Sequence, residues 1–175
     1  MMNMKRKIFS GALMVAAALL MLFPSCVDLD GDKVEYTAEK EQQFLKEYID
    51  GLVSKGVNVD TTTLGVFYVR QKEGTGPFPA AGDTISIKYV GYLMDGTSFD
   101  TSFRNNGDSL WTYVIEPGKN IKGWEEMMPL MNKGCKMEFV IPSSLAYGSQ
   151  WAGYIPPYSS LIFVAVMDNV RKKAQ

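Results

Sequence analysis

Histidine is absent from the 175-residue sequence, and this absence excludes several kinds of chemistry. No Ser-His or Cys-His nucleophile pair can form, no histidine-ligated zinc or haem site is available, and the commonest general base is missing. Any reaction that this protein catalyses must therefore proceed without imidazole.

The sequence also has few cysteines and no marked excess of either charge. Cys26 and Cys135 are the two cysteines, so at most one disulfide could form. The 18 basic and 19 acidic side chains give a formal net charge of -1. Because no basic excess is available to meet a phosphate backbone, we expect no nucleic-acid partner. The hydrophobic fraction of 46% is ordinary for a globular protein and is compatible with one compact domain plus further segments.

Residues 1–25 have the features of a secretory signal peptide. Basic side chains at positions 5–7 precede an apolar run at 8–23 that is short for a bilayer span, and Pro24 and Ser25 follow it. The sequence LFPSC at 22–26 resembles a bacterial lipobox, so Cys26 is the predicted lipidation site and the first residue of the mature chain. An uncleaved membrane anchor and an ordinary exported protein without lipid are the alternatives.

Residues 26–36 form a predicted acidic tether. Asp28, Asp30, Asp32 and Glu35 lie in a polar stretch that cannot bury enough apolar surface to fold alone. Acidic residues directly after a lipidated cysteine resemble the surface-export signal of some Gram-negative lipoproteins, and a solvated linker is the alternative. We expect an exported protein, lipid-anchored through Cys26 to the outer membrane bilayer of a Gram-negative bacterium, on the periplasmic face or the cell surface.

Residues 37–56 have the pattern of an amphipathic helix. Thr37 suits the N-cap, Glu39 and Glu41 suit the first turn, and Gly56 suits the end. Six apolar side chains fall on one face: Phe44, Leu45, Tyr48, Ile49, Leu52 and Val53. We expect this face to pack on the protein's own domain; a homodimer contact or the groove of a partner is the alternative.

Residues 57–175 predict an α+β domain. From position 61 the apolar period changes to two, with strands expected at 66–70, 85–93, 110–115, 135–141 and 160–167 and a hairpin turn at Asp95 and Gly96. The last strand is apolar on both faces, which favours a central place in the sheet. A short helix around Trp124, Met127 and Met131, which Pro129 ends or kinks, would cover one face of the antiparallel sheet.

Six short motifs occur in order between positions 82 and 170. They are IKYVGYL at 87–93, DGTSFD at 95–100, IKGWEE at 121–126, AYG at 146–148, IPP at 155–157 and LIF at 161–163. Together they resemble the FKBP-type peptidyl-prolyl cis-trans isomerases. The resemblance implies a twisted antiparallel sheet wrapped around a short helix, proline-containing polypeptide clients, macrolides as further ligands, and neither a metal nor another cofactor.

The resemblance also implies an aromatic pocket that binds proline. Trp124 would form its floor, Asp100 would be the pocket carboxylate, and the Ile121 backbone N-H and the Tyr147 hydroxyl would donate to substrate carbonyls. The remaining catalytic or substrate-binding positions carried over are Tyr89, Phe99, Trp111, Asn120, Ile155 and Phe163. Lys119 stands where the family often has an acid, and the loop at 149–154, with Trp151 and Tyr154, is shorter than usual.

Two other features of the sequence favour structural roles. Cys135 lies on an alternating strand, so a buried reduced thiol is the better interpretation than a catalytic one. Glu125 and Glu126 point in different directions on a helix and suit its first turn. The function predicted first is therefore prolyl isomerisation in exported proteins. The alternative is a non-catalytic module or chaperone that binds proline-containing segments in the same pocket.

Overall fold

The computed structural model describes residues 35–104 and 109–174. The signal peptide predicted at 1–25, the lipidation site Cys26 and all but the end of the predicted tether lie outside the described residues. Within the described ranges, no helix combines the length and the hydropathy that a bilayer span requires.

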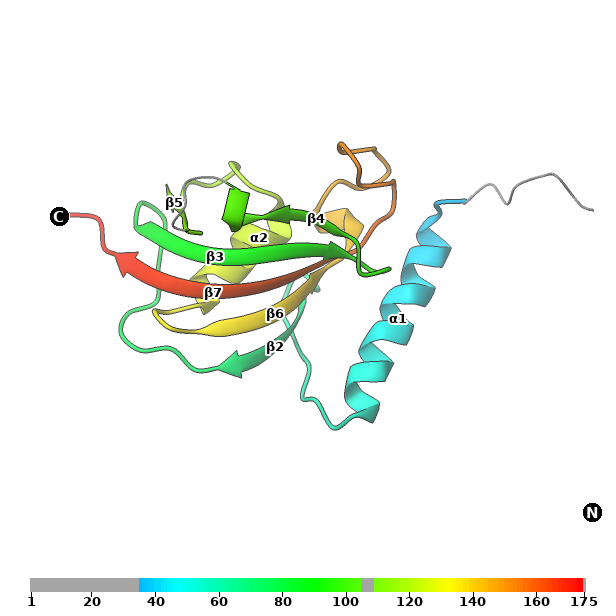
Figure 1. Ribbon diagram of the computed structural model, residues 1–175, viewed down its shortest axis with the longest axis horizontal. Helices are drawn as coiled ribbons and strands as arrows, with labels where there is room; N and C mark the ends of the chain where they lie inside the picture. The colour runs from blue at the N-terminus through cyan, green and yellow to red at the C-terminus, as the bar shows by residue number, and fades with distance from the viewer. Residues whose placement is uncertain (1–34, 105–108, 175) are drawn as a thin grey trace, which may run out of the picture. The chain divides into compact units, whose positions relative to one another are not determined.

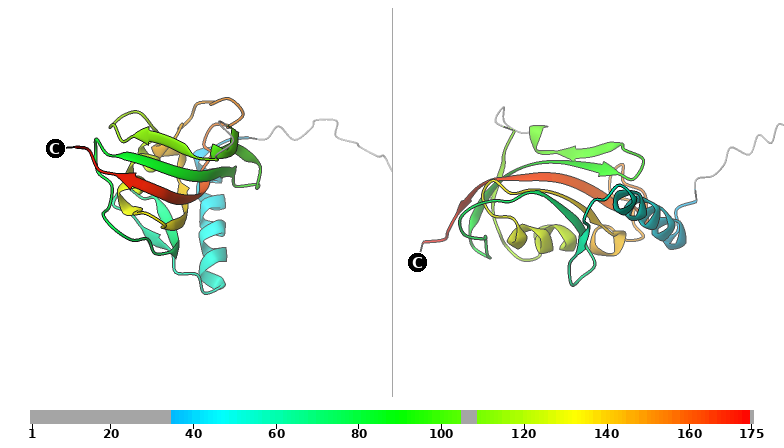
Figure 2. Two further views of the ribbon diagram at one scale, coloured as in Figure 1. Left: turned by 60° about the vertical axis from the view of Figure 1, so that its left-hand side comes forward. Right: turned by 90° about the horizontal axis from the view of Figure 1, so that it is seen from below.

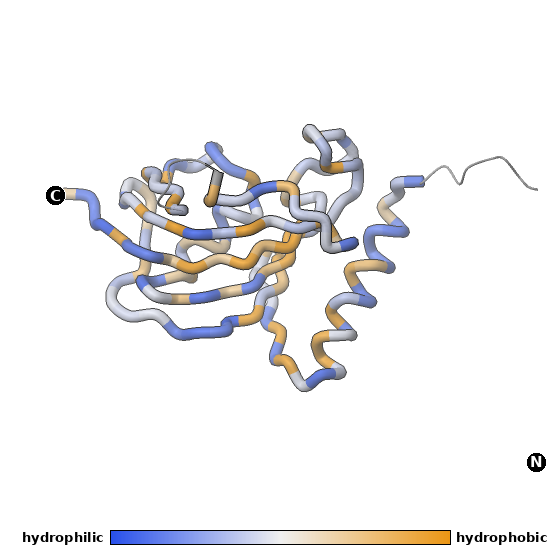
Figure 3. Tube along the Cα trace, in the orientation of Figure 1, coloured by the Kyte–Doolittle hydropathy of each residue, from blue (hydrophilic) through white to orange (hydrophobic). Residues whose placement is uncertain are grey.

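An antiparallel sheet of seven strands forms the domain (Figure 1). The strands are β1 Asp60–Thr61, β2 Phe67–Lys72, β3 Thr84–Leu93, β4 Ser98–Thr101, β5 Trp111–Val114, β6 Lys136–Ile141 and β7 Leu161–Arg171. Their order is β1-β2-β6-β7-β3-β4, and β5 pairs with the first half of the β3 edge whose second half pairs with β4. The α+β fold predicted from the sequence is confirmed, including the central position of β7, whose middle is strongly hydrophobic (Figure 3).

The short helix α2, Lys122–Met127, lies against the concave face of the sheet (Figure 2). A 3-10 turn, Met128–Leu130, follows it and contains Pro129. Pro129 lacks the N-H that a longer α-helix would use, which explains why the helix ends where the sequence predicted. Gly123, Trp124 and Met127 are the buried residues of α2.

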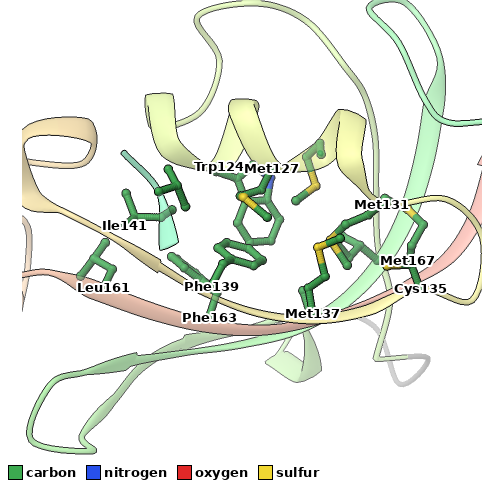
Figure 4. Close-up of a cluster of buried hydrophobic side chains, with 14 of the residues drawn as sticks. Trp124, Met127, Met131, Cys135, Met137, Phe139, Ile141, Leu161, Phe163 and Met167 are labelled. Carbon is green, nitrogen blue, oxygen red and sulfur yellow. The ribbon is translucent and has the colours of Figure 1, made fainter. Parts of the chain in front are cut away.

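The core between α2 and the sheet has an aromatic end and a methionine-rich end (Figure 4). Trp124, Phe139 and Phe163 meet at the aromatic end, where Phe139 stacks on Phe163 with ring centroids 5.5 Å apart. Met131, Met137, Met167 and Cys135 fill the other end, and Met127 lies beside Trp124. None of these five side chains has any exposed surface. Because methionine is flexible and polarisable, it can fill an irregular volume between a helix and a twisted sheet.

Cys135 is a free, fully buried thiol, as expected. Burial raises its pKa, although the Arg70 guanidinium donates a hydrogen bond to its Sγ at 3.3 Å and acts in the opposite direction. The thiol therefore remains protonated near neutral pH and contributes to the core by packing.

The helix predicted at 37–56 is α1, Ala38–Ser54, with Thr37 as N-cap; the Lys40 backbone N-H donates to the Thr37 hydroxyl at 3.2 Å. The helix α1 packs on the domain less closely than its apolar face predicted. No residue of α1 is buried, and Phe44 and Val53 are more than half exposed. Leu45, Tyr48, Ile49 and Leu52 are half-buried.

Gly123 and Gly51 provide a matched pair of stability predictions. A Cβ at Gly123 would overlap the buried Ile141 side chain and lie only 3.1 Å from the Ile141 Cβ. Such overpacking typically costs about 1–3 kcal/mol, so Gly123→Ala should lower the free energy of unfolding by that amount.

A Cβ at Gly51, inside α1, meets nothing within 4 Å. Gly51→Ala should therefore raise the free energy of unfolding by about 0.5–1 kcal/mol, since alanine is the better helix former.

Urea unfolding of the two variants and the wild type measures both effects. Equal stability of Gly123→Ala and the wild type would contradict the tight contact between α2 and β6.

Candidate active site

A cavity of about 680 Å³ opens between β3, β4, the start of α2 and the segment 144–148. Nine of the ten pocket positions predicted from the sequence line it: Tyr89, Phe99, Asp100, Trp111, Asn120, Ile121, Trp124, Tyr147 and Phe163. These positions come from six separate parts of the chain, and the fold brings them together. Ile155 is the exception.

Ile155 does not line the cavity and belongs to the hydrophobic core, with 5% of its surface exposed. Its backbone N-H and C=O both bond to Ala152, which closes the 152–155 turn and faces the side chain inward. Trp151 and Tyr154 of the same loop are exposed and are not lining residues either.

Trp124 forms the floor of the cavity. Its ring is 3% exposed and lies 5.1 Å from the rings of both Tyr89 and Phe163. The Trp124 Nε1-H donates to the Tyr113 hydroxyl at 2.8 Å, which fixes the orientation of the indole. Tyr113 stacks on Trp111 with centroids 4.1 Å apart.

The supporting role of Tyr113 was not predicted. Trp111 and Tyr113 are two residues apart on one strand, so they share a face of β5. That spacing was the signal that could have identified Tyr113 as a neighbour of the pocket floor.

Asp100 accepts hydrogen bonds on both carboxylate oxygens. The Tyr89 hydroxyl donates to Oδ2 at 2.7 Å, and the Thr101 backbone N-H donates to Oδ1 at 2.8 Å. These bonds hold the carboxylate and the Tyr89 ring in fixed positions at the cavity wall. They leave Asp100 suited to an electrostatic or orienting role in the cavity.

Phe99 forms the wall beside Asp100 and lies edge-on to Phe163, with centroids 5.5 Å apart. This position depends on Gly91 in β3, since a Cβ there would lie 2.7 Å from the Phe99 ring and 3.0 Å from the Phe163 ring. A glycine at position 91 therefore allows the two phenyl rings to close over the strand.

Ile121 and Tyr147, the two hydrogen-bond donors proposed from the sequence, border the cavity. Ile121 is the N-cap residue of α2, and among the described residues nothing accepts a hydrogen bond from its backbone N-H. Tyr147 is 41% exposed and lines the cavity, and its hydroxyl likewise has no protein partner within the described part of the chain. Both groups are therefore available to carbonyl oxygens of a bound peptide.

Tyr89 and Tyr113 keep their protons near neutral pH. Burial and the hydrogen bond to Asp100 raise the pKa of Tyr89, and burial raises the pKa of Tyr113 to about 12.

The two acids of α2 accept hydrogen bonds from backbone groups, which agrees with the structural roles expected for them. Glu125 accepts from the Asn120 N-H at 3.0 Å, a bond that lowers the pKa of Glu125, and Glu126 accepts from the Leu64 N-H at 3.0 Å.

No group of three or more metal-ligating side chains occurs among residues 35–104 and 109–174. The cavity instead combines aromatic walls, one oriented carboxylate and two free donors. This set can strip water from an apolar ring and hold the carbonyl groups on either side of it.

Comparisons with known proteins agree with this geometry. The chain is similar to FkpA, an FKBP-type peptidyl-prolyl cis-trans isomerase, of Aeromonas hydrophila, with 35% identity over 84% of this chain and 53% of that protein. FkpA of Escherichia coli K12 is also 35% identical, over 79% of this chain and 50% of that protein. The chain thus spans about half the length of these curated relatives.

Solved structures show the same fold. The crystal structure of Escherichia coli FkpA matches with a TM-score of 0.67 and 31% identity, over 78% of this chain and 62% of that one. A peptidyl-prolyl cis-trans isomerase from Pseudomonas syringae matches with a TM-score of 0.65 and 29% identity, over 79% of this chain and 98% of that one. The family model for FKBP-type peptidyl-prolyl cis-trans isomerases matches residues 76–167, just over half of the chain. The chain therefore belongs to the FKBP-type peptidyl-prolyl cis-trans isomerase family.

Proposed function

We propose that this protein accelerates the cis-trans isomerisation of X-Pro peptide bonds in polypeptide clients. The observation that carries the proposal is the aromatic cavity over Trp124, with Asp100 oriented in its wall and the Ile121 N-H and Tyr147 hydroxyl free at its border. Membership of the family supports the same reaction.

The reaction needs no proton transfer, which suits a chain without histidine. Rotation of a peptide bond has a barrier of about 18–20 kcal/mol, because amide resonance holds the planar form. Water stabilises the charge-separated planar form, so an apolar cavity that excludes water favours the twisted form. Removing about 5 kcal/mol from the barrier would accelerate rotation by three to four decades.

Each pocket group then has a separate role. The proline ring would rest on Trp124 between the Phe99 and Phe163 rings, which exclude water. The Ile121 N-H and the Tyr147 hydroxyl would hold the flanking carbonyls, which limits motion to the X-Pro bond. The Asp100 carboxylate, held by Tyr89, would polarise the bound amide.

Isomerisation of short X-Pro peptides, followed by NMR exchange, tests the proposal. The wild type should accelerate exchange, and Asp100→Ala should reduce kcat/KM by about tenfold, equivalent to 1.4 kcal/mol of transition-state stabilisation. Asp168→Ala is the matched control, because Asp168 is exposed on β7 outside the cavity.

The same experiment separates catalysis from simple binding. A folded wild type that binds proline peptides without accelerating exchange would contradict the enzyme proposal. The alternative, a non-catalytic module or chaperone that uses the pocket, would then be the better account.

The setting of this activity is a proposal from the sequence. The apolar run at 8–23 and the LFPSC sequence support export and a lipid on Cys26, and with it attachment to the outer membrane. The half-exposed apolar face of α1 would suit contact with a second copy of the chain. The aromatic cavity would suit macrolides as competing ligands.

A further inference from the structure

The carboxylate of Glu41, in the first turn of α1, bonds to two buried serines of the domain. Its Oε1 accepts from the Ser143 backbone N-H at 2.6 Å and from the Ser160 hydroxyl at 2.6 Å. Its Oε2 accepts from the Ser143 hydroxyl at 2.5 Å. Ser143 and Ser160 are only 4% and 2% exposed. Three donors thus converge on one carboxylate at a position where little water is available to replace it.

Ser143 begins the segment that carries Tyr147 to the pocket. It starts a 3-10 turn, Ser143–Leu145, and its C=O accepts from the backbone N-H groups of Ala146 at 2.9 Å and Gly148 at 2.8 Å. The Gly148 C=O in turn accepts from the Tyr158 N-H at 2.8 Å. Ala146, Tyr147 and Gly148 line the active-site cavity. The position of Ser143 therefore sets the position of this wall.

The segment also separates two cavities. A second cavity, of about 670 Å³, lies between α1 and the domain, and Ser144 and Gly148 line both cavities. Leu45 and Ile49 of α1 border the second cavity and so leave part of the apolar face unfilled. Among the described residues, Glu41 is the one residue of α1 that hydrogen-bonds to this segment.

A hydrogen bond from α1 and an aromatic contact just before α1 also join this part of the chain to the domain. The Tyr48 hydroxyl donates to Glu138 at 2.8 Å, but Glu138 lies on β6 and not on the pocket segment. Tyr36, just before α1, lies edge-on to Trp151 with ring centroids 5.6 Å apart. Of these contacts, the Glu41 bonds are the ones that reach the turn before Tyr147.

We propose that Glu41 is a positioning residue of the active site: it holds the Ser143–Gly148 segment so that the Tyr147 hydroxyl meets the substrate carbonyl. The helix α1 thereby becomes part of the binding apparatus although it does not touch the peptide. This inference rests on the proposed function for the role of Tyr147, and its experiment includes a measurement that does not depend on catalysis.

The kinetic part compares Glu41→Ala, Glu41→Gln and the wild type on an X-Pro peptide. Glu41→Ala should raise KM about fivefold with kcat changed less than about twofold, because uniform binding of the carbonyl is lost. The glutamine in Glu41→Gln has nearly the same shape as glutamate and can still hydrogen-bond to Ser143. The KM of this variant should therefore stay close to that of the wild type. Glu39→Ala is the control, since Glu39 is an exposed acid of the same helical turn.

A double-mutant cycle with Ser143→Ala tests the route of the effect. If Glu41 acts through Ser143, the combined variant should raise KM no more than Glu41→Ala alone. Additive effects of the two substitutions would overturn the proposed route.

Amide hydrogen exchange tests the positioning directly. In Glu41→Ala the amides of Ala146, Gly148 and Tyr158 should exchange at least about tenfold faster, while those shared by β3 and β7 keep their rates. Unchanged exchange at these three amides would overturn the inference, whatever the kinetics. A wild type that neither isomerises nor binds the peptide would instead refute the proposed function, and the exchange rates would still decide whether Glu41 holds the segment.

Discussion

Replacing Phe99 with alanine is expected to lower kcat/KM for an X-Pro peptide about hundredfold, a loss of about 2.7 kcal/mol in transition-state stabilisation. The Phe99 ring forms one wall of the cavity and closes on Phe163 over Gly91. Without the ring, water reaches the bound amide and stabilises its planar form again. The variant loses an interaction that favours the twisted bond, so the main effect should fall on kcat.

Phe78→Ala is the control for this measurement. Phe78 is 52% exposed and lies outside the cavity, so its removal should leave kcat/KM unchanged. Phe99→Leu should give an intermediate loss, because leucine excludes some water from the wall. Equal rates for Phe99→Ala and Phe78→Ala would show that water exclusion at this wall does not limit the reaction.

The second large effect concerns stability. Phe139→Ala should reduce the free energy of unfolding by about 3–5 kcal/mol, the usual cost of removing a buried phenyl ring. Phe139 is completely buried, stacks on Phe163 and lies 5.7 Å from the ring of Trp124. Removing the Phe139 ring would leave a cavity between the pocket floor and the sheet. The side chains around this cavity are closely packed, so they could move little to fill it.

Urea or thermal unfolding of Phe139→Ala beside Phe78→Ala measures the difference. Because Phe78 is exposed, Phe78→Ala should change the free energy of unfolding by less than about 0.5 kcal/mol, as substitutions at surface positions usually do. A loss below 1 kcal/mol at Phe139 would mean that the aromatic end of the core can repack around a missing ring.

Strand positions could be predicted from the sequence because they depend on short-range patterns. The alternation from Ile85 to Leu93 predicted β3, and apolar residues on both faces of the last strand predicted its central place. The pocket residues were predicted in another way, through the resemblance of motifs such as those at Phe99-Asp100 and Trp124 to the FKBP-type isomerases. Their meeting in one cavity depends on the fold and not on their local sequence.

Contacts between distant segments were not predictable in the same way. Glu41 looked like an acid that suits a helix N-terminus, and nothing in its local sequence indicates serines that are 102 and 119 residues away. Ile155 begins the IPP motif at 155–157, but the 152–155 turn directs its side chain into the core. Arg70 also reaches Cys135 only through the pairing of β2 with β6. These arrangements depend on tertiary packing, which a single sequence does not reveal.

The central position of β7 determines when the domain can fold during its synthesis. β7 is the last strand among the described residues, yet it lies between β6 and β3 and supplies the longest ladder of the sheet. A nascent chain that ends before residue 161 has both of those strands but lacks the one that joins them. The sheet can therefore close only after the C-terminal residues have left the ribosome, and pairing between strands so far apart in sequence is slow. For the export proposed above, this order of assembly would leave the sheet open until β7 has been synthesised.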